Sequence, residues 1–95
     1  MNVNAPTQTV TGALTLETVP LLYRNSAGWF VGGGELILDL AQVERADSAG
    51  LALLIEWLRR AKATNCKLRF ANIPEPVQTL IRINGLQGAL LDSLI

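Results

Sequence analysis

Histidine is absent from this 95-residue sequence, and cysteine occurs only once, at Cys66. Without histidine the chain lacks the most common general base and metal ligand of proteins. One cysteine among scattered carboxylates provides no metal-ligand spacing. A lone cysteine also excludes an intramolecular disulfide, and it fits a reducing compartment. We expect Cys66, which precedes an apolar strand-like run, to be a small buried hydrophobic residue.

The sequence also lacks the glycine and serine motifs of common enzymes. No Gly-x-x-x-x-Gly-Lys-Ser/Thr phosphate loop occurs, and Gly32-Gly33-Gly34 precedes a strand-like run instead of opening a helix. No Gly-x-Ser-x-Gly elbow surrounds Ser48, and no partner base is available to activate its hydroxyl. We therefore predict that the protein is not an enzyme and uses neither a metal ion nor a cofactor.

Charge and hydropathy exclude several classes of partner. The formal net charge is zero, and the densest basic cluster is Arg59-Arg60-Ala61-Lys62. This cluster lies near the end of a predicted helix, where cations favour the helix macrodipole, so it predicts no binding to nucleic acid or anionic lipid. No apolar run approaches the roughly 20 residues that span a bilayer. Met1 to Pro6 has no apolar signal-peptide core. These features predict a cytoplasmic protein without membrane insertion.

The hydrophobic residues, 49% of the chain, are distributed as in one packed domain. We expect a flexible tail at residues 1–6 and a domain over residues 7–95. In the first helix Thr15 is the expected cap, and Leu16, Val19, Leu22 and Tyr23 recur at helical spacing. The expected elements are a strand at 8–14 with a bend or bulge at Gly12, a helix ending before residue 28, a buried strand at 35–40, a polar turn at 41–47, a helix at 48–64, a strand at 67–71, a helix ending at residue 85, and a short apolar element within 87–95.

Strands and helices that alternate in this way imply parallel strands joined by right-handed crossover helices. We predict a small open α/β sheet of about three to five strands, with the helices mainly on one face. Trp29 and Phe30 form an apolar patch outside the predicted strands, and the sequence leaves open whether they belong to the core or to a contact surface.

The segment Asp47-Ser48-Ala49-Gly50 begins the strongest predicted helix and allows two interpretations. In the first, it only initiates the helix: Ser48 is the N-cap, Asp47 complements the positive helix end, and Gly50 permits close packing. In the second, the same solvent-facing turn is a docking or switch site around Ser48.

The helical periodicity indicates which side of this helix faces outward. The core-facing stripe should place Ala49, Leu53 and Arg60 away from the core, with Trp57 on the flank where it can touch Leu53. Together with Glu56, these residues would form a contact surface for a partner protein. The alternative is that another packed helix covers them. The expected core stripe consists of Leu51, Leu54, Ile55, Leu58 and Ala61.

The stretch from Leu38 to Leu51, which reads LDLAQVERADSAGL, resembles the signature of STAS domains, the fold of anti-sigma-factor antagonists. The resemblance continues through Leu68 to Pro74 and Leu80 to Leu86, and it covers residues 36–95 more closely than the first third. STAS domains usually begin with two strands, whereas the region before Thr7 is too short for a complete additional strand.

Two branches of the STAS family bear on function. In the anti-sigma-factor antagonists the motif resembles Asp-Ser-Ser-Gly, and a partner kinase phosphorylates the second serine. Ala49 stands at that position here. In the small STAS subunits of Mla phospholipid-transport ABC complexes, the MlaB branch, the residue matching Ser48 lies at the contact with the ATPase subunit. The sequence Asp47 to Leu54 is similar to this second branch.

The resemblance implies a non-catalytic cytoplasmic STAS subunit on the inner face of the inner membrane. Such a subunit binds and regulates or stabilises the ATPase of an ABC complex that also contains permease and substrate-binding subunits and maintains outer-membrane lipid asymmetry. The alternatives are an anti-sigma-factor antagonist, with Ser48 as a candidate phosphorylation site, and a nucleotide- or lipid-binding module. The expected partner-binding residues are Asp47, Ser48, Ala49, Gly50, Leu53, Glu56, Trp57 and Arg60.

Overall fold

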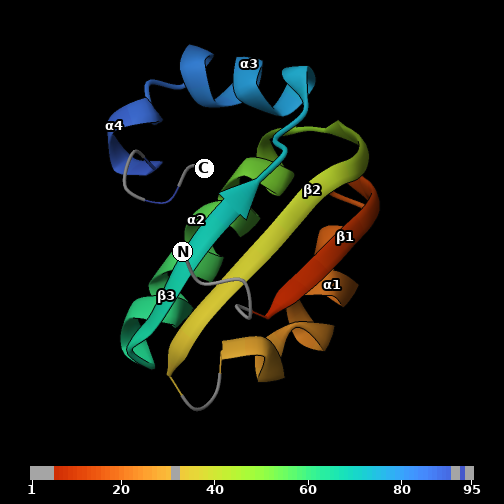
Figure 1. Cartoon of the computed structure of the whole chain (residues 1–95). Helices are drawn as coiled ribbons and strands as arrows, with labels where there is room; N and C mark the ends of the chain where they lie inside the picture. Colours follow the sequence, from red (N-terminus) through yellow and green to blue (C-terminus); the bar gives the residue numbers. More distant parts are fainter. Residues whose placement is uncertain (1–5, 31–32, 91–92, 94–95) are drawn as a thin grey trace.

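Strands and helices alternate along the chain as the sequence predicts. Figure 1 shows the computed structural model of the protein, which describes residues 6–30, 33–90 and 93. The expected tail lies outside the described residues except for Pro6, whose carbonyl oxygen accepts a 2.9 Å hydrogen bond from the Ile37 N–H. The described elements are β1 (Thr7–Leu14), α1 (Val19–Asn25), the 3-10 helix η1 (Ala27–Phe30), β2 (Gly34–Ala46), α2 (Ser48–Ala63), β3 (Cys66–Ala71), α3 (Glu75–Ile83) and α4 (Gln87–Leu90).

The three strands form one parallel sheet in the order β1-β2-β3. Both crossovers step to the next strand in the same direction, so right-handed connections must place α1 and α2 on the same face. In Figure 1 these two helices lie behind the sheet, and α3 lies beyond the carboxyl end of β3. The predicted small parallel α/β domain with helices mainly on one face is therefore confirmed.

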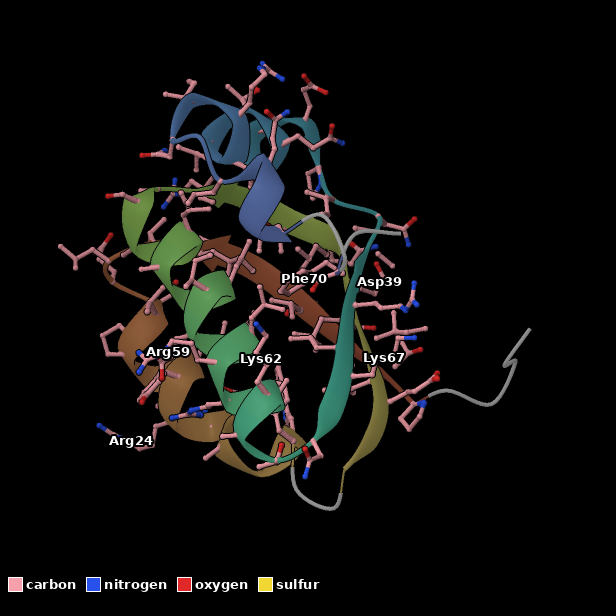
Figure 2. All side chains as sticks on the ribbon, turned by 90° about the vertical axis from the view of Figure 1, so that its left-hand side faces the viewer. Arg24, Asp39, Arg59, Lys62, Lys67 and Phe70 are labelled. Atoms are coloured by element: carbon pink, nitrogen blue, oxygen red, sulfur yellow. The ribbon has the colours of Figure 1, made fainter. Side chains whose placement is uncertain are left out.

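Alternation along the strands separates a buried face from an open one. Leu38 and Phe70 are fully buried beneath the helices. Lys67 and Asp39 point to the opposite face, as Figure 2 shows. Cys66 is a free, buried thiol, and desolvation raises its pKa, which confirms the expected role as a small buried residue.

The prediction of a polar turn at residues 41–47 is wrong, because β2 continues to Ala46. The register between β1 and β2 shifts twice, on either side of Gly12, which has a φ of +82°. These irregularities change which residues of β2 face the core, so the alternation that includes Leu40 resumes at Val43. A strand whose alternation changes phase looks like a turn in sequence.

Helix α1 begins later than the sequence suggests, because Thr18 and not Thr15 occupies the N-cap position. The Thr15 N–H donates to Thr18 Oγ1 at 3.0 Å, and the Val19 N–H donates to the Thr15 carbonyl at 2.9 Å. This turn leaves Leu16 outside the helix with 72% of its surface exposed, although the sequence pattern places it in the helix.

Candidate partner-binding site

Asp47 organises the junction between β2 and α2. It is the N-cap residue of α2, and its Oδ1 accepts hydrogen bonds from the Ala49 and Gly50 N–H groups at 2.9 and 3.3 Å. Its Oδ2 accepts a 3.0 Å hydrogen bond from the Leu16 N–H. The bond from Leu16, with those from Gly50 and Ala49, lowers the pKa of Asp47 despite some opposing desolvation. One carboxylate thus fixes two separate segments of the chain.

Gly50 is needed because α2 approaches β1 very closely. A Cβ atom at this position would collide with the Leu14 carbonyl oxygen and would come within 2.7 Å of the Leu14 Cβ. The Asp47 N–H donates to the same Leu14 carbonyl at 3.0 Å. Gly50 is buried and therefore shapes the turn from inside, without offering a surface to a partner.

Ser48 is the first residue of α2 and is exposed to solvent. The prediction that Ser48 is the N-cap is wrong: the neighbouring Asp47 has the extended backbone of a cap residue and accepts the cap hydrogen bonds. The fold therefore makes no use of the Ser48 hydroxyl as a cap. Ala49 beside it is half-buried.

The outward orientation that we predict for Leu53 and Trp57 is wrong, because they are 2% and 0% exposed. The Trp57 indole Nε1–H donates a 2.8 Å hydrogen bond to Ser26 Oγ, just after α1. The Trp29 ring lies 5.6 Å from the Trp57 ring, between centroids. The segment α1–η1 therefore covers Leu53 and Trp57, which is the alternative that the sequence left open. Phe30, 1% exposed, belongs to the hydrophobic core.

Arg60 and Glu56 remain on the surface of α2 and are both half-buried. The Arg60 guanidinium lies 3.8 Å from the centroid of the Tyr23 ring and donates a 3.2 Å hydrogen bond to the Tyr23 carbonyl. Glu56 forms a 2.8 Å ion pair with Arg59. Of the eight expected site residues, the structure exposes Ser48, leaves four half-buried at the surface and buries three. The half-buried residues are Asp47, Ala49, Glu56 and Arg60, and the buried residues are Gly50, Leu53 and Trp57.

Residues 1–93 of the sequence match the model of a known protein family. These residues match the family described as "Mlab, STAS domain". The chain belongs to this STAS family. No curated individual protein matches the sequence significantly. Among solved structures, the STAS domain is similar to an anti-sigma factor antagonist, SpoIIAA, in its unphosphorylated form. The TM-score is 0.71 at 17% identity, over 100% of this chain and 83% of the other, and this likeness supports the fold alone.

The STAS domain also has a groove on the other side of α1, next to β1. Its volume is about 380 Å³, and it is open to solvent. No group of three potential metal ligands occurs among the described residues. No helix in the described part of the chain is long and apolar enough to cross a membrane. The groove is lined by Thr11, Gly12, Ala13, Glu17, Thr18, Leu21, Leu22 and Asn25.

Proposed function

We propose that this STAS domain is a non-catalytic subunit that binds the ATPase of a phospholipid-transporting ABC complex and regulates or stabilises it. The complex would maintain the lipid asymmetry of the outer membrane. The observation that carries the proposal is the Ser48 turn. The chain belongs to the MlaB family, and its Ser48 is exposed to solvent on a backbone that the Asp47 hydrogen bonds fix. A small hydroxyl beside Ala49 leaves room for a partner backbone to approach.

The structure of this turn suits recognition better than catalysis. Asp47, the nearest carboxylate, is occupied by three backbone N–H groups and has a lowered pKa, so it is a poor general base at neutral pH. Burial of a surface that is already ordered costs little conformational entropy, which favours binding. A binding subunit of this kind would be cytoplasmic and would lie at the inner face of the inner membrane through its complex.

An anti-sigma-factor antagonist controlled by a kinase is the second candidate, because the fold is similar to SpoIIAA. Ala49 argues against it, since an alanine cannot accept a phosphate at the position where the resemblance expects the second serine. Incubation with a cognate kinase and ATP, followed by mass measurement, separates the two candidates. A phosphate on Ser48 would favour the antagonist.

Co-purification tests the proposed function. The chain is isolated from its own cells, and its partners are identified by mass spectrometry, for the wild type, for Ser48→Arg and for Thr9→Arg. Thr9 is an exposed position on the sheet, away from the α2 turn, and it serves as the matched control. We expect an ABC ATPase and a permease with the wild type and the control, and neither with Ser48→Arg. Recovery of a histidine-kinase-like protein would instead support the antagonist.

A further inference from the structure

Helices α1 and α2 run side by side in the same direction. The segment before α1 is joined to the start of α2 by the hydrogen bond from Leu16 to Asp47, and the end of α1 is joined to the last turns of α2 by the contact between Tyr23 and Arg60. Between these two ends the helices form one continuous outer surface. We name it the α1–α2 seam and define it by Leu16, Tyr23, Arg24, Ala49, Arg59 and Arg60.

The seam is apolar at the end near Ser48. Leu16 is 72% exposed, an unusual position for a large aliphatic side chain that is held on a fixed backbone. Its N–H is bound by Asp47, and the turn between Thr15 and Thr18 fixes the residues around it. Ala49 is beside it at the start of α2, because the same Asp47 carboxylate also binds the Ala49 N–H. A partner that covers Ser48 would therefore also meet Leu16.

The seam is basic at the opposite end. Arg60 is held in place by the Tyr23 ring and carbonyl, and Arg24 is exposed in the last turn of α1. Arg59, 75% exposed, forms a 2.8 Å ion pair with Glu56 of its own helix. Figure 2 shows Arg24 and Arg59 pointing away from the sheet on the same side of the molecule. This end thus carries three cations and one carboxylate.

We propose that the α1–α2 seam binds one segment of the ATPase subunit that is apolar where it meets Leu16 and acidic where it meets Arg24, Arg59 and Arg60. This inference rests on the function proposed above. Ser48 and Arg60 are twelve positions apart in one helix, which is about 18 Å, so an interface of ordinary size covers both ends. A carboxylate matches the planar fork of Arg60, whose ring contact already restricts its motion.

The apolar end is tested with Leu16→Asp and its matched control Leu21→Asp. Leu21 lies on the groove side of α1 and is 58% exposed, so both changes introduce the same charge at an exposed leucine. We expect Leu16→Asp to raise the Kd for the purified ATPase about tenfold to hundredfold, as expected when a buried leucine contact is lost. Leu21→Asp should leave the Kd unchanged, and both variants should melt like the wild type.

The basic end is tested with Arg24→Glu/Arg59→Glu and its matched control Lys67→Glu/Arg69→Glu. The control pair is on β3, away from the helical layer, and carries the same change in charge. We expect the seam variant to raise the Kd about tenfold at about 0.1 M salt, mainly through slower association. At about 1 M salt, where the screening length is about 3 Å, the difference should disappear.

The outcomes separate this inference from the proposed function. If the wild type does not bind the ATPase, the proposed function fails. If the wild type binds and Ser48→Arg does not, but the seam variants bind like their controls, only the seam is wrong. The seam is also wrong if the wild type sediments with vesicles of anionic phospholipid and Arg24→Glu/Arg59→Glu abolishes that binding while its ATPase affinity stays normal.

Discussion

Ser26→Ala should destabilise the domain far more than a surface serine substitution does. Ser26 and Trp57 are each 0% exposed, and the indole N–H donates to Ser26 Oγ at 2.8 Å. Loss of this acceptor leaves a buried donor unpaired, which costs about 1–3 kcal/mol. The Ser26 hydroxyl also donates to the Tyr23 carbonyl at 3.1 Å, a bond that contributes about 0.5–1.5 kcal/mol. The two losses together span about 1.5–4.5 kcal/mol, and we expect a total of at least about 2 kcal/mol.

A double-mutant cycle isolates the contact between Ser26 and Trp57. Trp57→Phe removes the donor together with part of the ring, so its own cost includes a cavity. In the Trp57→Phe background, Ser26→Ala no longer leaves a donor unpaired, and its cost should fall to about 1 kcal/mol or less. Urea unfolding of the four proteins provides the free energies, and a loss of 2 kcal/mol should lower the Tm by about 8–16 °C. Equal costs of Ser26→Ala in both backgrounds would refute this account of why Trp57 is absent from the surface.

Two further predictions concern the α2 junction. Gly50→Ala should destabilise the domain by about 1–3 kcal/mol in urea unfolding, because the collision with Leu14 outweighs the roughly 1 kcal/mol gain in helix propensity. The control is Gly88→Ala, which lies in a helix with open space around it and should be neutral or stabilising. Since the folded pKa of Asp47 is lowered, its contribution to stability is present above the unfolded pKa of about 3.9 and is lost as the pH falls through the folded pKa. Asp47→Asn should therefore make stability less dependent on pH below about 4, and an unchanged acid limb in urea midpoints would contradict this role.

The sequence predicted the fold class well, because the fold class depends on the order of strands and helices and on the right-handed crossover of their connections. Parallel strands and helices on one face follow from the alternation of strand and helix alone. The boundaries depended on local chemistry that periodicity does not reveal. Because of the two register shifts around Gly12, the second half of β2 lacks regular alternation and was predicted as a turn. The turn from Thr15 to Thr18 moves the start of α1 to a later residue than predicted.

The surface of α2 was harder to predict than its existence. Leu51 lies on one side of the helix and Leu53 and Trp57 lie on another, and all three are buried because α2 packs against both the sheet and the α1–η1 segment. A single core-facing stripe was therefore too narrow. The position of Leu16 depends on a hydrogen bond to Asp47, 31 residues further along the chain, which no local pattern indicates.

The most direct test of the partner-binding claim is a titration of the purified ATPase subunit with the wild type, Ser48→Arg and Thr9→Arg, after all three are shown to have the same unfolding midpoint. The account predicts equal affinities for the wild type and Thr9→Arg, and no measurable binding by Ser48→Arg. Binding of Ser48→Arg with the affinity of the wild type would show that the exposed turn at the start of α2 is not the contact.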